Sequence, residues 1–402
     1  MTQQASRQRR LLRRAMKVGI KQKILFVLVG VLALSTALNA LLASFFTNRQ
    51  NEQAAFAGLR NDLLAWQGDL QSMTRQLRGV ALSTVGDVAI LNQLAELMTL
   101  EFNLEDPARA AERHEMARTL GYRKTVALNR LQLALRTGGF SSIAVYTRGQ
   151  LSHVISAADA GMSLRREDGR QAWITATANG RGDIPFQSWP AWREAPVPVE
   201  HARVPETLDR AGVSFLFPVP GQTVMEIAVP VQGYVDDVLT DAQRSSIVRY
   251  FSDLSVAGET GPGNAGAASH AAPTPGRKPL VMAVVVFRRM IGRAMLENVA
   301  QKSGKSPVLL SPDGRHIQQL DEQPVVPPEM LQQAQAALSD SAPDPLQRTV
   351  TVGEKSFYVA LLPWHFEGRP RLMLGLAAPT ARCTTSGRRS WPSCWRPAPP
   401  CC

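Results

Sequence analysis

Five side chains in the middle of the chain have the chemistry to hold a small molecule: Tyr146, Arg170, Trp173, Asp183 and Trp189. A guanidinium binds a carboxylate through two parallel hydrogen bonds, and an aromatic ring closes over an ammonium group or an apolar tail. Together they form a minimal recognition site for a small zwitterion or organic acid. For each residue alone, the alternative is ordinary aromatic packing or a surface arginine.

The chain has none of the motifs that usually mark catalysis, such as G-x-S-x-G, H-E-x-x-H, an EF-hand loop or a dinucleotide fingerprint. Gly304-Lys305-Ser306 resembles the end of a phosphate-binding loop, but Val299 stands where that loop needs its first glycine. The six histidines lack metal-ligand spacing, and all four cysteines lie in the last 20 residues. We therefore expect no catalysis, no metal and no cofactor.

The formal net charge of +12 comes from the two ends of the 402-residue chain. Residues 1–23 carry eight basic side chains and no acidic one, and the last 21 residues carry four more arginines. The part between them is neutral. A protein that binds a duplex needs a basic face on its folded part, so we expect no nucleic-acid partner.

An uncharged apolar run of 23 residues, Ile24–Phe46, follows the basic segment and is long enough to cross a bilayer. The basic residues before it place the N-terminus in the cytoplasm. The alternative is a cleaved signal peptide, but the run exceeds the usual 7–15 apolar residues and no A-x-A site follows. We expect a retained anchor in the bacterial inner membrane, with the main part of the chain in the periplasm.

Apolar residues with alternating spacings of three and four begin just after this run, as in one long helix. They are Phe56, Leu59, Leu63, Trp66, Leu70, Met73, Leu77 and Val80. This seam predicts either the core-facing side of a monomer's helix or the interface of a parallel homodimer. Helical patterns continue through Ala89–Phe102 and Ala108–Arg136, with a break near Asp106-Pro107.

Past residue 140, short apolar runs separated by turn residues replace the helical spacing. The predicted strands are Ser142–Tyr146, Leu151–Ser156, Gly212–Val219, Val224–Val231, Leu280–Phe287, Val308–Leu310, Phe357–Leu362 and Leu372–Leu376, with a helix at Ile291–Lys302. This pattern predicts an α+β fold with two antiparallel sheets.

Two segments lack buriable side chains. Residues 258–279 are rich in Gly, Ala, Pro, Ser and Thr, which predicts a disordered insertion within a domain. The tail after residue 377 has no periodicity and no acid, and it is rich in Arg, Pro, Trp, Ser and Cys. Such a bias is typical of a GC-rich gene translated out of frame. We therefore expect a frameshift product here; the alternative is a genuine flexible tail.

The order of these parts resembles the double Cache (PAS-like) extracytoplasmic sensor region of bacterial receptors, over about residues 20–376. The residues that carry the resemblance are Lys21-Gln22-Lys23, the uncleaved helix, Glu226–Val231, Val284–Phe287, Val308–Leu310 and Ser311–Arg315. The resemblance implies a membrane-anchored sensor, as in chemoreceptors, sensor kinases and cyclases, whose ligand is an organic acid or an amine. Family members that bind amino acids pair Arg with Trp-Tyr, whereas Ile174 follows Trp173 here, so the resemblance does not imply an amino-acid ligand.

The resemblance divides the chain as follows: a cytoplasmic segment (1–23), a transmembrane helix (24–46), a juxtamembrane helix region (47–104), a distal PAS-like module (105–290), a proximal one (291–376) and the tail (377–402). We expect ligand sensing with signalling across the membrane through a dimer. The output domain, kinase or cyclase, would lie in a C-terminal part absent from this chain. The rival hypothesis is an anchored periplasmic scaffold without a signalling role, in which the seam binds a partner.

Overall fold

A computed structural model describes most of the chain between residues 20 and 380. The described residues are 20–147, 149–165, 170–177, 192–198, 201, 211–218, 221–233, 280–320, 326–336, 344–353, 355–367 and 369–380. The predicted insertion at 258–279 lies outside them, as do residues 381–402 of the predicted tail. The chain divides into two compact units, residues 1–61 and 62–402, and both sheets belong to the second.

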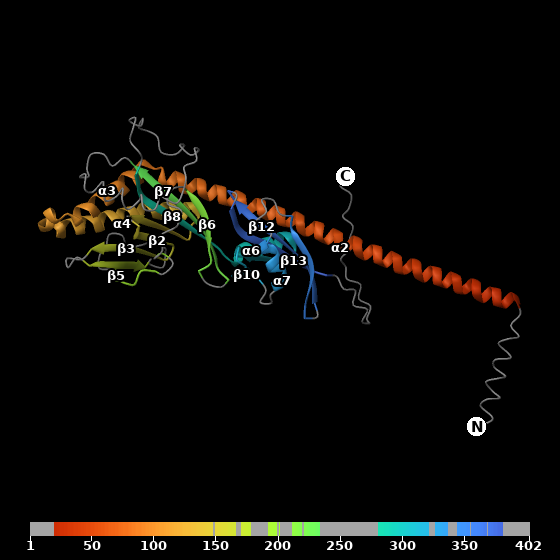
Figure 1. Ribbon diagram of the computed structural model, residues 1–402. Coiled ribbons are helices and arrows are strands. Elements are labelled where there is room, and N and C mark those ends of the chain that lie inside the picture. The colour runs from red at the N-terminus through yellow and green to blue at the C-terminus, as the bar shows by residue number, and fades with distance from the viewer. Residues whose placement is uncertain are drawn as a thin grey trace, which may run out of the picture. The chain divides into compact units, whose positions relative to one another are not determined.

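The described helices precede or flank the strands (Figure 1). They are α2 (Ile20–Val85), α3 (Val88–Glu105), the short 3₁₀ helix η1 (Pro107–Glu112), α4 (Arg113–Gly138), α6 (Arg293–Ser303) and α7 (Pro328–Ala336). The predicted break near Asp106-Pro107 is confirmed, because the Asp106 carboxylate accepts a hydrogen bond from the backbone N–H of Ala108 and caps η1.

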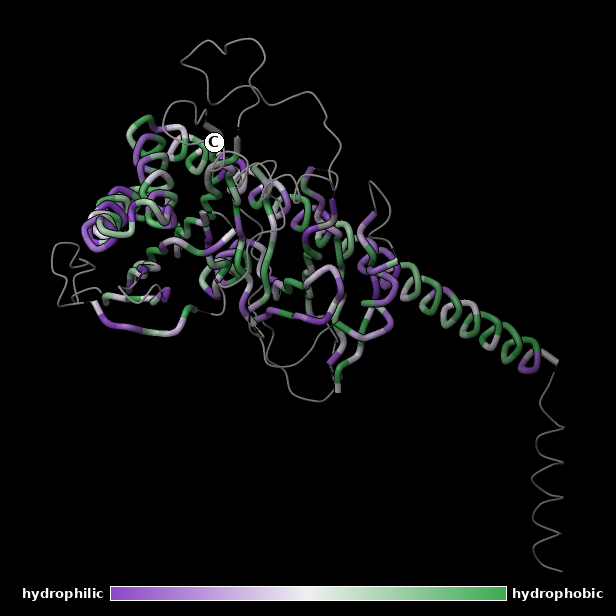
Figure 2. The backbone as a smooth tube through the Cα atoms, turned by 60° about the vertical axis from the view of Figure 1, so that its left-hand side comes forward, coloured by the Kyte–Doolittle hydropathy of each residue, from purple (hydrophilic) through white to green (hydrophobic). Residues whose placement is uncertain are grey.

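Helix α2 is continuous over 66 residues and contains the predicted membrane segment. It is the one helix among the described residues that is long and apolar enough to cross a bilayer. Its apolar side chains from Ile24 to Phe46 are exposed in the isolated chain, and Figure 2 shows this part mainly in the apolar colour. Exposed apolar residues all round a helix are typical of a segment that contacts lipid.

The first sheet has eight antiparallel strands in the order β5-β4-β3-β2-β1-β8-β7-β6. These are β1 (Ser142–Thr147), β2 (Gln150–Ser156), β3 (Asp159–Arg165), β4 (Gln171–Thr177), β5 (Arg193–Glu194), β6 (Gly212–Leu216), β7 (Thr223–Gly233) and β8 (Leu280–Ile291). The predicted hairpins β1–β2 and β6–β7 are present. Strands β3 and β4 fall where the sequence predicted none.

The second sheet has five antiparallel strands in the order β10-β9-β13-β12-β11. These are β9 (Ser306–Leu310), β10 (Ile317–Gln319), β11 (Leu346–Val352), β12 (Lys355–Phe366) and β13 (Arg369–Pro379). Helix α7 covers one face, where Met330 and Ala334 pack against Val359 and Leu361 of β12. The α+β class with two antiparallel sheets is confirmed.

The seam on α2 is buried against the chain's own elements. Within the second unit, Leu63, Trp66, Leu70 and Leu77 are at most 3% exposed. The hydroxyl of Thr74 contacts the sulfur of Met225 on β7 at 3.9 Å. The core-facing alternative therefore holds for these residues. They do not form the interface of a parallel homodimer, as the second alternative had it, because the same side chains cannot also contact a second chain; Phe56 and Leu59 lie in the first unit.

Two seam positions are also shifted. Met73 and Val80 are only half-buried, whereas their neighbours Thr74 and Ala81 are fully buried. The buried stripe therefore runs through spacings of four, three and four, which is 11 residues per three turns. That period suits a straight helix lying on a sheet, whereas a strict seven-residue repeat suits a coiled coil.

Candidate functional site

The two faces of the eight-stranded sheet have different coverings. Val145 of β1 and Val285 of β8 face α3 and α4, since they line a small cavity together with residues of both helices. Side chains alternate along a strand, so the neighbours of these valines point to the opposite face. That face, called the site face below, carries an apolar cluster: Ala144, Tyr146, Val154, Trp173, Ala228, Val284 and Val286.

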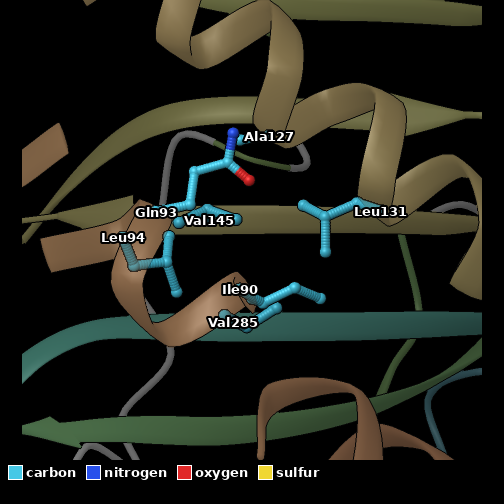
Figure 3. Close-up of a pocket in the computed structure, with 7 residues that line it drawn as sticks. All are labelled: Ile90, Gln93, Leu94, Ala127, Leu131, Val145 and Val285. Carbon is cyan, nitrogen blue, oxygen red and sulfur yellow. The ribbon is translucent and has the colours of Figure 1, made fainter. Parts of the chain in front are cut away.

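The cavity on the helix side is too small for a ligand. Its volume is about 10 Å³, and its lining is apolar apart from Gln93 (Figure 3). Such a volume is at the lower limit for one water molecule. The Gln93 amide donates to the backbone carbonyl of Arg123 at 3.4 Å, which ties α3 to α4. This space is therefore a packing feature between the helices and the sheet.

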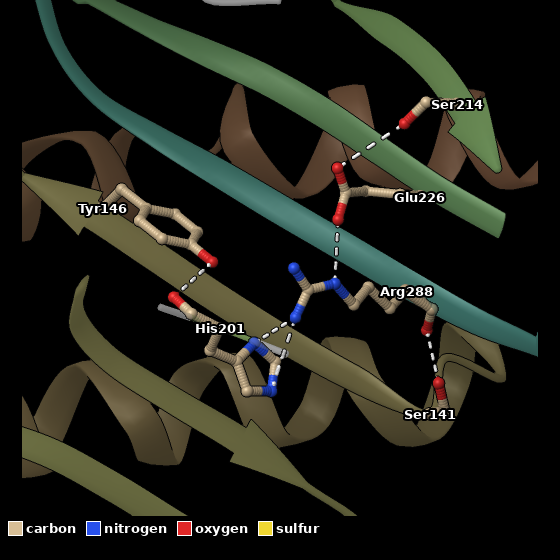
Figure 4. Close-up of polar contacts among 6 residues, drawn as sticks. All are labelled: Ser141, Tyr146, His201, Ser214, Glu226 and Arg288. Atoms are coloured by element: carbon tan, nitrogen blue, oxygen red, sulfur yellow. Dashed lines mark hydrogen bonds and ion pairs between the residues drawn. The ribbon is translucent and has the colours of Figure 1, made fainter. Parts of the chain in front are cut away.

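The site face carries a buried ion pair. Glu226 of β7 and Arg288 of β8 are paired across the two strands, and both residues are at most 5% exposed. Arg288 Nε donates to Glu226 Oε2 at 2.9 Å, and the Ser214 hydroxyl on β6 donates to Glu226 Oε1 at 3.5 Å (Figure 4). Burying two charges costs solvation, so such a pair rarely adds stability. A guanidinium and a carboxylate are also the groups that bind a ligand's carboxylate and amine, so this pair is the candidate binding site.

His201 and Tyr146 complete this polar cluster. His201 Nδ1 lies within hydrogen-bond distance of Arg288 Nη1, and the Tyr146 hydroxyl donates to the His201 carbonyl at 3.1 Å. Burial, together with the Arg288 charge, lowers the pKa of His201 to about 3, so its ring is neutral and accepts from the guanidinium. Burial raises the pKa of Tyr146, although Arg288 opposes the rise. The cluster thus holds one cation and one anion beside two neutral polar groups.

Trp173 borders the cluster on β4. Its ring lies over Gly161 of β3, where a Cβ atom would be 2.4 Å from Trp173 Cζ2, so only glycine fits there. Trp173 is 5% exposed, and its indole N–H has no hydrogen-bond partner among the described residues. A buried donor without an acceptor is uncommon. Tyr146 and Trp173 therefore supply apolar surface and an unused donor to the site face.

The structure brings together two of the five predicted site residues, Tyr146 and Trp173. Arg170 is exposed immediately before β4, so its side chain is not part of the buried cluster. Asp183 and Trp189 lie outside the described residues. Their roles remain predictions.

The sequence analysis missed three residues of the cluster: His201, Glu226 and Arg288. A signal for Arg288 was present, since it continues the alternation of Val284 and Val286 on one face of a predicted strand. Glu226 likewise stands at the start of an apolar strand. His201 gave no such signal, because it lies outside every strand that the sequence predicted.

A second buried polar cluster lies on the helix side of the sheet. Lys124 of α4 binds Glu101 of α3 at 2.8 Å and donates to the Ser163 carbonyl on β3 at 2.9 Å. The extra residue of a β-bulge, Ser152, donates to Glu101 at 3.3 Å and contacts His153. These bonds tie both helices to β2 and β3. Among the described residues, no group of three His, Cys, Asp or Glu side chains is arranged to hold a metal ion.

Comparisons with known proteins match solved structures only. No protein-family profile and no curated protein matches the chain. The similar structures include the sensory domain of the Campylobacter jejuni chemoreceptor Tlp3, with 9% identity and a TM-score of 0.29 over 80% of this chain and 97% of that chain. All are low in identity.

Two further matches come from Vibrio. A domain of a sensory box/GGDEF family protein from Vibrio parahaemolyticus has 10% identity and a TM-score of 0.33, covering 80% of this chain and 98% of that one. The sensor domain of the V. cholerae histidine kinase DctB has 11% identity and a TM-score of 0.27, covering 79% and 98%. Two of these three structures are sensory or sensor domains, and the third is a domain of a sensory box/GGDEF family protein.

Proposed function

We propose that this chain is a membrane-anchored extracytoplasmic sensor, which binds a small organic acid or amine on the site face and transmits binding across the inner membrane. The observation that carries the proposal is the buried ion pair between Glu226 and Arg288, bordered by Tyr146, His201 and Trp173. The guanidinium of Arg288 matches a carboxylate and the carboxylate of Glu226 matches an amine. The aromatic surface suits the ligand's apolar part.

The anchor is part of the proposal. The exposed apolar segment of α2 supports a membrane span, and the basic residues before it support a cytoplasmic N-terminus. Helix α2 continues without a break from this segment to Val85, and its later part is buried against the sheets. In this proposal, a displacement of the sheets relative to α2 is the event that α2 passes on toward the membrane.

A parallel homodimer is also part of the proposal. Because the seam in the second unit is buried, this part of α2 would contact a partner chain through exposed positions such as Leu64 and Gly68. Leu64 is 45% exposed, so its side chain is accessible to a second chain.

A thermal-shift screen of the full chain in detergent tests the function, with panels of carboxylic acids and of primary amines as probes. Binding to the folded state raises the midpoint of unfolding in a saturable manner. We expect stabilisation by at least one compound of these classes, and its loss in the double variant Glu226→Gln/Arg288→Met. The matched control is Arg289→Met, which changes the next residue of β8, on the other face. If no compound stabilises the chain, the anchored scaffold becomes the better hypothesis.

A further inference from the structure

One arginine on α2 contacts both sheets. The terminal nitrogens of Arg78 bind the carboxylate of Glu367, in the turn between β12 and β13, and the backbone carbonyl of Ala211, just before β6. The second bond measures 3.2 Å. The side chain is 21% exposed, and its Nε is buried without an acceptor among the described residues. Arg78 is therefore placed where the two sheets and the long helix meet.

The turn that presents Glu367 is unfavourable for a glutamate. Phe366 and Arg369 are paired, so Glu367 lies in the tight turn between β12 and β13. Glu367 has a φ of 52°, and it is the one non-glycine residue with positive φ among the described residues. Asn, Asp or Gly is preferred at such a position, because a longer side chain strains the left-handed backbone. The ion pair with Arg78 explains why a carboxylate stands there.

Strand β6 connects this junction to the site face. It is an edge strand, and its successive side chains point to opposite faces. Ser214 donates to Glu226 in the candidate site, while Phe215 packs edge-on against Trp364 of β12, with ring centroids 5.4 Å apart. Just past the strand, the Phe217 ring stacks on that of His316, the residue before β10, with ring centroids 5.5 Å apart. A shift of β6 therefore changes contacts in the candidate site and in the second sheet together.

We propose that Arg78 is the positioning residue that couples the two sheets. By binding Glu367 and Ala211 from one turn of α2, it holds β6 and the β12–β13 turn in one arrangement, so that a movement of either is passed to the other and to α2. The coupling between the sheets stands on these contacts alone. Its use in signalling rests on the proposed function.

Hydrogen–deuterium exchange of the full chain in detergent, without any added ligand, tests the coupling. The decisive variant is Glu367→Asn, because asparagine suits the left-handed turn and lacks the carboxylate that binds Arg78. We expect amide exchange in β6 to rise by about threefold or more, although the substitution lies in the other sheet. Arg78→Gln is expected to raise exchange in both β6 and the β12–β13 turn.

Arg75→Gln is the matched control, since Arg75 is exposed one turn earlier on the same helix. It should leave exchange in both segments unchanged. If Glu367→Asn alters exchange only within its own hairpin, or nowhere, the proposed coupling is overturned.

Another variant tests the link between the junction and the candidate site separately from the coupling of the two sheets. Ser214→Ala removes the hydrogen bond to Glu226 while keeping the strand. We expect it to raise exchange in the β12–β13 turn, which links the candidate site to the junction. Unchanged amide exchange in the β12–β13 turn would contradict that link. The response to Glu367→Asn then still decides whether Arg78 couples the sheets, and ligand binding is decided by the thermal-shift screen.

Discussion

Glu226 and Arg288 lie opposite each other on neighbouring strands and form an ion pair from which solvent is almost excluded. Each member of the pair has one more polar partner. Ser214 of β6 donates to the Glu226 carboxylate, and His201 binds the Arg288 guanidinium. Both charges thus keep polar partners on the face of the sheet that turns away from α3 and α4. The contribution of this pair to the free energy of unfolding is therefore testable by substitution of one member or of both.

Removing one member of the pair should destabilise the fold strongly. In Arg288→Met the Glu226 carboxylate stays buried without its counterion, so we expect the free energy of unfolding to fall by about 3–5 kcal/mol. In Glu226→Gln/Arg288→Met no charge is buried, and the loss should be within about 1 kcal/mol. Urea denaturation followed by far-UV circular dichroism measures both.

The exposed ion pair between Arg348 and Glu329 provides the control. Arg348→Met should change the free energy of unfolding by less than about 0.5 kcal/mol, because solvent screens this pair. Equal losses in the single and the double variant of the buried pair would contradict our interpretation of it.

The contact between Gly161 and Trp173 should tolerate no extra carbon atom. Since a Cβ at position 161 would be 2.4 Å from the indole ring, Gly161→Ala should cost about 1–3 kcal/mol of unfolding free energy. Trp173→Leu should remove most of that cost in the double variant. Gly79→Ala, in an open helical position, is expected to stabilise the chain by up to about 1 kcal/mol. Additive effects of the changes at 161 and 173 would show that the contact is absent.

Two buried histidines should make the fold sensitive to acid. Burial, and the nearby charges of Lys124 and Arg288 respectively, lower the pKa values of His153 and His201 to about 3, from 6.5 in the unfolded chain. Between these values the unfolded chain binds protons that the folded chain does not, so the free energy of unfolding falls as the pH falls. Above pH 6.5 this contribution is complete.

Each of these histidines contributes a slope of up to about 1.4 kcal/mol per pH unit within this window. Urea denaturation at pH values from 4 to 7 measures the slope. His201→Gln should reduce the slope by the contribution of one histidine, which is up to about 1.4 kcal/mol per pH unit. A slope that is the same in the variant and the wild type would mean that His201 titrates alike in both states.

The stripe on α2 allows a direct comparison of two adjacent residues. Ala81 is fully buried and Val80 is half-buried. Ala81→Gln should therefore lower the free energy of unfolding by about 2 kcal/mol or more, because it forces a large polar side chain into a packed site. Val80→Gln should cost less than about 1 kcal/mol. If Val80→Gln cost more than Ala81→Gln, Val80 would be the buried residue, as the heptad spacing of apolar residues predicted.

Sequence patterns located the elements whose signals are local. The hairpins β1–β2 and β6–β7 and the break at Asp106-Pro107 were predictable, because turn residues and period alone determine them. Strands β3 and β4 were not, since Gly161 and Trp173 fit adjacent strands only through the packing of the indole ring over the glycine. On α2, the spacing alone could not distinguish Met73 from Thr74 as the buried residue.

The candidate site was predictable only in part for the same reason. Tyr146 and Trp173 are conspicuous by residue type. The ion pair depends on register between strands that are 62 residues apart, and His201 lies 87 residues from Arg288. No local pattern fixes such a pairing.

The most direct test of the central claim is a binding titration of the full chain with the best compound from the carboxylic acid and amine panels. Isothermal titration calorimetry should give saturable binding to the wild type and to Arg289→Met with similar affinity. Binding to Glu226→Gln/Arg288→Met should be at least about 100-fold weaker, since charge-assisted hydrogen bonds are lost. Equal affinity for the wild type and this double variant would contradict a ligand site at the Glu226–Arg288 pair.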